Sequence, residues 1–223
     1  MAKRPIVIAF DVIETLFPLE PIRQRLIDAG QPGHLLEQWF ARLLRDAFAV
    51  VASGGYRPFG EFAAAALRSS ATTPLTDDQI KEILAGFPEL DPHPDVVPAV
   101  RRLAATGIRM ITLTNGSAAI TSALLRRAGI AEDIEQVLSV DDIQRWKPAP
   151  EIYQHAATST GVPLDRVALV AAHAWDTHGA HEAGLVTGWI SRLEDEYPKV
   201  FAPPDVTGPD LGTVVDGLLA LPA

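Results

Sequence analysis

The sequence contains no cysteine, which excludes both a disulfide framework and a thiol nucleophile. No apolar run reaches the roughly 18 residues that suggest a membrane-spanning helix. The Lys and Arg residues are scattered, without the dense basic cluster that nucleic-acid binding favours. The N-terminal segment, residues 1–5, lacks the apolar stretch of a signal peptide. We therefore expect a cytoplasmic protein whose partners include neither a membrane nor a nucleic acid.

The chain is long and apolar enough to build a sizeable core. Its 223 residues allow one large domain, or a core domain with a smaller insertion. Hydrophobic residues make up 48% of the chain and the net charge is -9, a composition that disfavours disorder.

Asp11 is the first candidate functional residue. It ends the apolar run 5–10, which is typical of a buried strand. In an open α/β sheet, chemistry concentrates at the carboxyl ends of the strands. An isolated Asp after a strand is often only a helix cap, so the role of Asp11 depends on what lies elsewhere in the chain.

The pattern after this strand is helical and later alternates between strand and helix. Apolar residues recur every three to four positions over 35–51, and further helices are predicted over 59–68 and after Thr76. The Pro-rich stretch 88–94 is interpreted as a linker. Strands are then predicted over 108–113, 136–139, 167–171 and 186–190, with helices over 96–105, 117–128, 149–160, from 171 to Gly184, and over 211–219.

Alternating strands and helices predict an α/β fold, a doubly wound Rossmann-like parallel sheet with helices on both faces. The helical block after the first strand then forms an insertion. We expect residues 1–17 and 92–223 to form the core, and residues 18–91 to form a helical cap over the carboxyl edge of the sheet.

Polar residues follow several of these strands and should meet at that edge. They are Asp11 and Thr15, the run Thr114-Asn115-Gly116-Ser117, Lys147 before a Pro, and His173 with Asp176. Each has an ordinary alternative when taken alone: a turn with an N-cap, a solvated lysine, or an acid at a helix start. The order of the complete set is much more specific.

This order resembles the haloacid dehalogenase superfamily, over nearly the whole chain and including the inserted cap. The resemblance is closest to the type II branch, the L-2-haloacid dehalogenases, because Trp175-Asp176 followed by Gly179-Ala180 is similar to its fourth motif. Tyr153, six residues after Lys147, is similar to that branch as well.

Most members of the superfamily are magnesium-dependent phosphatases, and this sequence departs from them. Ile13 stands where they carry the acid–base Asp, and Ala172 where they usually carry a metal-binding carboxylate. Magnesium requires oxygen ligands. The sequence therefore disfavours a phosphatase and predicts neither a metal nor another cofactor.

The resemblance implies a hydrolase that cleaves the carbon–halogen bond of short 2-haloalkanoic acids. Asp11 would displace the halide and form an ester, which water then hydrolyses with Asp176 as base or water-orienting group. Lys147 would keep Asp11 ionised. Donors to the substrate or to developing negative charge would come from Thr15, Thr114 and Asn115. Further residues implied in binding the small halogenated acid are Ile13, Tyr153, His173 and Trp175.

The chain departs from the type II pattern in its first motif, in its fourth motif and in the cap. Ile13 and Glu14 replace a Tyr-Gly pair in the first motif, and Ala171-Ala172-His173 replaces Ser-Ser-Asn in the fourth. His173 either replaces the water-positioning Asn or, if charged, binds halide.

The halide-binding arginine of the family follows a tryptophan in the first long cap helix. Trp39 and Phe59 match its flanking aromatics, but Phe40 stands in the arginine position. The nearest arginine, Arg42, is rotated by roughly 200° along a helix. Either the helix turns so that Arg42 enters the site, or Arg42 lies on the solvated face and the leaving group is held differently.

Two alternatives remain open at this point. The replaced residues could suit fluorinated or bulkier acids, or the protein could be a catalytically weak binding protein with the same fold. The family often dimerises, which makes a homodimer the expected assembly, although no apolar patch in the sequence identifies the interface.

Overall fold

A six-stranded parallel sheet forms the centre of the computed structural model, which describes residues 2–223. The strand order is β3-β2-β1-β4-β5-β6. The strands are β1 (Val7–Phe10), β2 (Arg109–Thr114), β3 (Gln136–Ser139), β4 (Val167–Ala171), β5 (Val186–Ile190) and β6 (Val206–Gly208). The predicted parallel α/β sheet is therefore confirmed.

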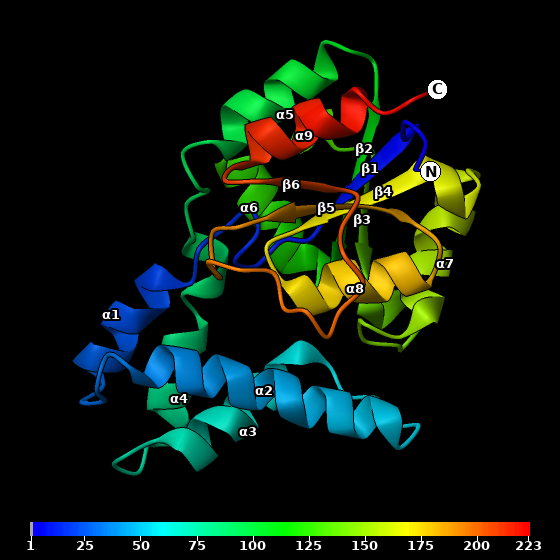
Figure 1. Ribbon diagram of the computed structural model, residues 1–223. Helices are drawn as coiled ribbons and strands as arrows, with labels where there is room; N and C mark the ends of the chain where they lie inside the picture. The colour runs from blue at the N-terminus through cyan, green and yellow to red at the C-terminus, as the bar shows by residue number, and fades with distance from the viewer. Residues whose placement is uncertain (1) are drawn as a thin grey trace.

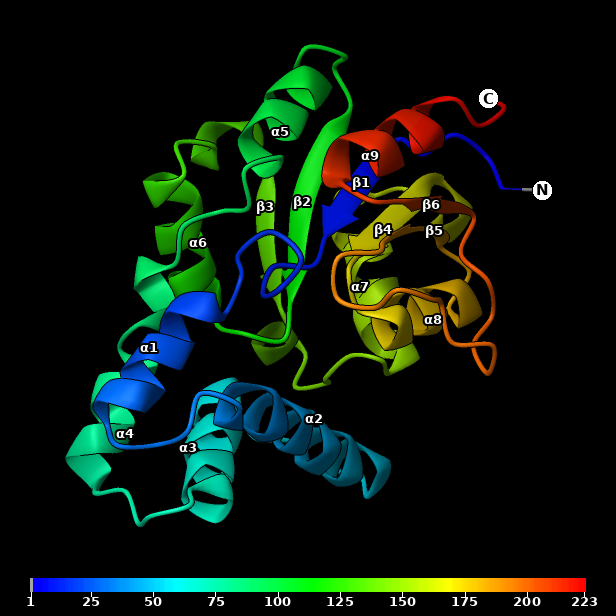
Figure 2. The ribbon, with the colours of Figure 1, turned by 60° about the vertical axis from the view of Figure 1, so that its left-hand side comes forward.

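Helices cover both faces of the sheet (Figures 1 and 2). On one face lie α5 (Val96–Ala104), α6 (Ala118–Arg127) and α9 (Leu211–Leu219), and on the other lie α7 (Pro150–Thr160) and α8 (Ala174–Glu182). Burial on both faces explains the continuous apolar runs of β1 and β4, whose residues are all buried.

Four helices between β1 and β2 form a separate group below the sheet (Figure 1). They are α1 (Glu20–Asp28), α2 (Leu35–Ala52), α3 (Phe59–Ser70) and α4 (Asp77–Leu84), and a short 3₁₀ turn, Phe87–Glu89, follows them. Aromatic pairs join the group to the sheet layers, including Phe48 with Trp175 at 5.1 Å and Phe59 with Trp146 at 6.1 Å between ring centroids. Among residues 2–223, no helix combines the length and apolarity that crossing a membrane requires.

Two elements were not predicted from the sequence. Helix α1 is short, lies between Pro18 and Gly30, has no side-chain cap, and buries only Ile22 and Leu26. Strand β6 has three residues at the edge of the sheet, so it carries little periodicity. The other predicted strands and helices occur within two residues of their expected bounds, except for the start of α8.

Candidate active site

Asp11 directly follows β1, and hydrogen-bond donors surround its carboxylate. The Nζ atom of Lys147 donates to Oδ1 at 2.9 Å, and the Oγ1 atom of Thr15 donates to Oδ2 at 2.6 Å. The Nδ1 atom of His173 lies 3.2 Å from Oδ2. Asp11 is only 6% exposed. A buried carboxylate is stable in its charged form only when a cation and hydrogen-bond donors lie close to it, and Asp11 has both.

Lys147 joins Asp11 to a second carboxylate. Its Nζ also donates to Oδ2 of Asp176 at 2.8 Å, and the hydroxyl of Tyr153 donates to Oδ1 of Asp176 at 2.6 Å. Lys147, Asp176 and Tyr153 are all 0% exposed. The ammonium group is therefore shared between two acids in a water-excluded network, where ionic interactions are stronger than at the surface.

Burial and charge act against each other on these groups. Burial raises the pKa of Asp11, but the charge of Lys147 and the hydrogen bonds from His173 and Thr15 outweigh it and hold the pKa below its usual value. Burial lowers the pKa of Lys147, and the two carboxylates more than reverse this effect. Burial raises the pKa of Asp176 against the opposing effect of Lys147. The pKa of Asp11 is thus lowered and that of Asp176 raised, so Asp11 is the more acidic of the two carboxyl groups.

The loop after β2 supports the site from the other side. The Oδ1 atom of Asn115 accepts a hydrogen bond from the backbone N–H of Lys147 at 3.0 Å, which fixes the lysine backbone. The Oγ1 atom of Thr114 accepts from the backbone N–H of Gly116 at 2.9 Å. Since the carbonyl oxygen of the Asn115 side chain is engaged, its amide N–H groups remain available to a substrate.

A small cavity lies above Asp11. Its volume is about 20 Å³, enough for about one water molecule. It is lined by Asp11, Ile13, Phe40, Leu44, Phe59, Thr114, Asn115, Gly116, His173 and Trp175. Two larger cavities border it. One of about 540 Å³ shares Phe40, Leu44, His173 and Trp175 with it, and one of about 250 Å³ shares Phe59.

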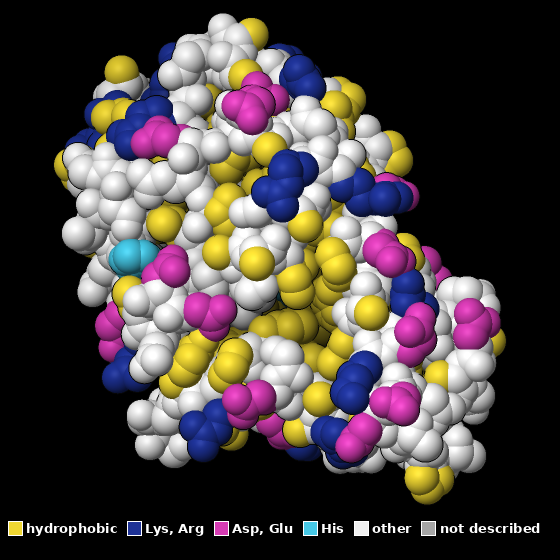
Figure 3. Space-filling model, turned by 180° about the vertical axis from the view of Figure 1, so that it is seen from behind, with side chains coloured by type: hydrophobic (Ala, Val, Ile, Leu, Met, Phe, Trp, Pro, Cys, Tyr) yellow, Lys and Arg dark blue, Asp and Glu magenta, His cyan; other side chains and the backbone are white. Residues whose placement is uncertain are grey.

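The cavity beyond Phe59 is mostly apolar. Figure 3 shows the face on which it opens as a hollow lined by hydrophobic side chains, between the sheet layers and the helical group. Its walls include Leu84, Phe87 and Ile120. Phe59 thus lies between the active-site cavity and the apolar one, and Phe40 is one of the four shared residues on the side of the larger cavity.

Most of the residues predicted for the site meet there. Asp11, Thr15, Lys147, Asp176 and His173 form one hydrogen-bonded cluster. Residues that line the small cavity as predicted are Ile13, Phe59, Thr114, Asn115, His173 and Trp175.

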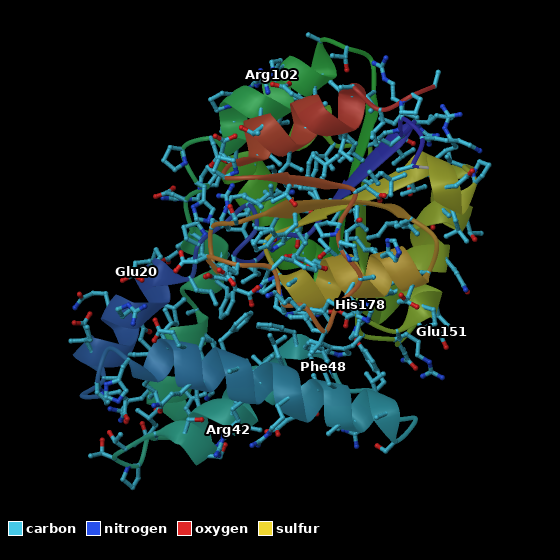
Figure 4. All side chains as sticks on the ribbon, viewed as in Figure 1. Glu20, Arg42, Phe48, Arg102, Glu151 and His178 are labelled. Atoms are coloured by element: carbon cyan, nitrogen blue, oxygen red, sulfur yellow. The ribbon has the colours of Figure 1, made fainter. Side chains whose placement is uncertain are left out.

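Three predicted binding residues do not line the cavity. Arg42 points away from the sheet, on the side of α2 opposite Phe48 (Figure 4), and its Nη1 donates to the carbonyl oxygen of Ser69 at 2.9 Å. Trp39 is fully buried and donates its indole N–H to the carbonyl oxygen of Ala63 at 2.9 Å. Tyr153 is occupied by Asp176. The prediction that Arg42 enters the site is wrong, because Trp39 fixes the rotation of α2.

The site residues predicted from the sequence did not include Phe40, Leu44 and Glu14. Phe40 and Leu44 lie one helical turn apart on α2 and line the cavity, and that i, i+4 spacing was the available signal. Glu14 has a φ of 65°, a backbone conformation that costs a non-glycine residue about 1 kcal/mol. Its side chain accepts a hydrogen bond from the backbone N–H of Leu19.

We expect Arg42→Ala to leave the catalytic rate within about twofold of wild type, since surface substitutions outside a site change little. Phe40→Ala is the matched comparison on the same helix and should change KM, because Phe40 lines the cavity. Steady-state kinetics of both variants check this. A tenfold loss of catalytic rate in Arg42→Ala would show that Arg42 takes part in the reaction after all.

Gly179→Ala should disturb the packing of Pro148 and Tyr153, which support the active site. A Cβ at this position would lie 2.5 Å from Cβ of Pro148 and 2.7 Å from the hydroxyl oxygen of Tyr153. We expect a loss of about 1–3 kcal/mol in the free energy of unfolding, together with lower activity, because Tyr153 would move off Asp176. Urea unfolding and kcat measure the two effects. Gly60→Ala, where a Cβ meets no atom within 4 Å, is the control.

The residues around Asp11 do not fit a magnesium ion. The positions that would supply further carboxylates hold Ile13 and Ala172, and Lys147 occupies the space between Asp11 and Asp176. Within residues 2–223, no group of three or more His, Asp or Glu side chains is arranged to hold a metal.

Comparison with known proteins agrees with this geometry. The chain is 27% identical over 217 residues to (S)-2-haloacid dehalogenase H-109 of Pseudomonas putida, covering 95% of this chain and 97% of that protein. The crystal structure of the L-2-haloacid dehalogenase RSc1362 superposes with a TM-score of 0.91 at 27% identity, covering 99% of this chain and all of that one. A dehalogenase solved with an intermediate complex matches with a TM-score of 0.86 at 26% identity, over 95% of this chain and 96% of that one.

A family model described as haloacid dehalogenase-like hydrolase matches residues 7–184, the segment that runs from β1 through α8 and includes every residue bonded to Asp11. The chain therefore belongs to the haloacid dehalogenase-like hydrolases.

Proposed function

We propose that this protein hydrolyses the carbon–halogen bond of short 2-haloalkanoic acids through an ester on Asp11. One observation carries the proposal: a buried carboxylate is held ionised by an ammonium group that it shares with a second carboxylate, without a set of metal ligands around it. The printed names of the relatives, which are 2-haloacid dehalogenases, support the same substrate class for this chain.

In the first step, a carboxylate oxygen of Asp11 attacks the carbon that bears the halogen. The new carbon–oxygen bond forms as the carbon–halogen bond breaks, and the halide leaves with the bonding electrons. The attack occurs opposite the leaving group, so a chiral substrate is inverted. The hydroxyl of Thr114 and the amide N–H groups of Asn115 line the cavity and would bind the substrate carboxylate.

In the second step, water attacks the carbonyl carbon of the Asp11 ester. The ester cleaves, the hydroxy acid leaves, and the Asp11 carboxylate is regenerated with the water oxygen in it. Lys147 and the hydroxyl of Thr15 would stabilise the negative charge that develops on the ester oxygens, because each already donates to one of the two Asp11 oxygens. No step requires a metal.

Residues 18–91 would act as the cap of this site. Phe40 and Phe59 come from that segment and close the small cavity, which excludes water and strengthens the interactions inside it. The sequence-based inferences of a cytoplasmic location and of a homodimer remain part of the proposal, and size-exclusion chromatography with light scattering tests the dimer.

The experiment is a panel of chloro-, bromo- and fluoroacetate and both enantiomers of 2-chloropropionate, assayed for free halide. A single-turnover reaction in ¹⁸O-water then locates the label. The proposal requires ¹⁸O in Asp11 first, because water attacks the ester carbonyl and the product oxygen comes from the enzyme. Label that appears first in the product would contradict an Asp11 ester.

A further inference from the structure

Asp176 is poorly placed to act on water. Both of its oxygens are engaged, one with Lys147 at 2.8 Å and the other with Tyr153 at 2.6 Å. It is 0% exposed and does not line the small cavity. Its contacts suit a carboxylate that holds Lys147 in position.

His173 is placed where such a water must lie. It directly precedes α8, lines the cavity of about 20 Å³, and has Nδ1 3.2 Å from Oδ2 of Asp11. Its ring is held near the rings of Phe40 and Trp175, with centroids 6.0 Å and 5.2 Å away. It is also the only side chain among those lining the cavity that combines an ionisable nitrogen with contact to Asp11.

We propose that His173, and not Asp176, is the base that takes the proton from the water hydrolysing the Asp11 ester. The inference rests on the proposed function and adds a catalytic residue to it. Its geometric basis is that His173 contacts Asp11 and lines the water-sized cavity, whereas Asp176 is bonded to Lys147 and Tyr153 and does not line that cavity.

The charge on Asp11 would control when His173 is protonated and therefore when it can act as a base. Burial lowers the pKa of His173, but the hydrogen bond and charge of Asp11, aided by Asp176 and Glu14, outweigh it and raise the pKa above its usual value. Once Asp11 is alkylated, its negative charge is gone, and burial then lowers the pKa of His173 without that opposing effect. His173 then loses its proton and becomes a base only after the ester has formed.

The charged groups near His173 come from several elements. Lys147 lies on the far side of Asp11. The larger cavity that also reaches His173 is bordered by Glu14, Glu20, Arg23, Glu37, Arg192 and Glu194. Arg23 is paired with Glu20 and Glu37, and Arg192 with Asp95, so these two cations are largely neutralised before they act on the imidazole.

The protons balance over one cycle. Protonated His173 releases a proton to solvent when the ester forms, and neutral His173 then takes one from the attacking water. It returns this proton to the departing alkoxide oxygen, which gives the hydroxy acid. The Asp11 carboxyl group finally gives its own proton to His173, which restores the initial pair, and each turnover yields one halide and one proton.

The test is a pre-steady-state experiment on His173→Gln and His173→Asn with bromoacetate. Both variants should release one halide per enzyme at a rate within about tenfold of wild type, the worth of one hydrogen bond to Asp11. Ester hydrolysis should slow by at least about 100-fold. Intact-protein mass spectrometry should therefore find the ester accumulated in both variants, and peptide mapping should locate it on Asp11.

Asp176→Asn is the contrasting variant and should slow halide release without accumulating ester. His181→Asn is the control for His173→Asn. It makes the same change at a histidine of α8 outside the cluster, and it should behave as wild type. The rate of ester hydrolysis in wild type should rise with pH to a plateau, and this rise should be absent in His173→Gln.

Two results would overturn the proposal: unchanged turnover in His173→Asn, or ester accumulation in Asp176→Asn but not in the His173 variants. Failure of the proposed function has a different signature, since the wild-type protein itself would then release no halide from any acid and form no adduct on Asp11.

Discussion

Asp11→Asn is expected to abolish halide release, with kcat reduced by at least about 10³-fold. The amide that replaces the carboxylate carries no negative charge and cannot displace a halide from carbon. Neither the Lys147 ammonium nor the ring of His173 can compensate, because neither group supplies the negatively charged oxygen that must attack the carbon. The measurement is halide release per enzyme at saturating substrate, with folding checked by circular dichroism.

The control is Asp165→Asn, which removes an acid that is about half exposed and pairs only with Lys3. It should retain wild-type turnover. Undiminished halide release by Asp11→Asn would show that Asp11 is not the nucleophile. If instead wild type releases no halide but both proteins bind a small acid equally well by calorimetry, the binding-protein alternative would stand.

Lys147→Met should cost both stability and activity. Removing the ammonium leaves Asp11 and Asp176 buried without their shared partner, and breaking such an ion pair typically costs about 3–5 kcal/mol in the free energy of unfolding. The loss of charge stabilisation on the Asp11 oxygens should lower kcat by about 10²-fold or more. Urea unfolding at neutral pH and halide-release kinetics provide the two numbers.

The same variant should change how stability depends on pH. The folded-state pKa of Asp11 is depressed, so its stabilising contribution is present above the unfolded pKa of about 4 and is lost as the pH falls below that value. Without Lys147 the depression shrinks, and the acid-side slope of stability should flatten relative to wild type. Lys199→Met, at an exposed lysine, should keep the wild-type slope. Parallel slopes in all three proteins would show that Lys147 does not set the pKa of Asp11.

The alternation of apolar runs predicted the sheet because helices bury the central strands β1, β4 and β5 on both faces. Strands β3, β4 and β5 occur with the predicted bounds. The weak elements were those that depend on distant parts of the chain: β6 exists because β5 offers it an edge, and α1 because its two apolar residues meet the rest of the helical group. Such support is not encoded locally.

The site could be predicted as far as parallel-strand topology determines it. Residues just past β1, β2 and β4 must share one edge, so Asp11, Thr114 and His173 were placed together correctly. The cap side could not be predicted in this way. Whether Phe40 or Arg42 faces Asp11 depends on the rotation of α2, which is set by Trp39 packing against α3 through its bond to Ala63. The i, i+4 spacing of Phe40 and Leu44 marks an apolar face of α2, but it does not say that this face meets Asp11.

The cavity above Asp11 holds about one water molecule, yet the reaction must admit a halo acid and discharge a hydroxy acid. We therefore expect each cycle to include a motion in which Phe40 or Phe59 moves aside and joins the cavity to one of its larger neighbours. Such gating takes microseconds to milliseconds. We expect higher solvent viscosity to slow product release, because it opposes this motion, without altering the bond-breaking chemistry.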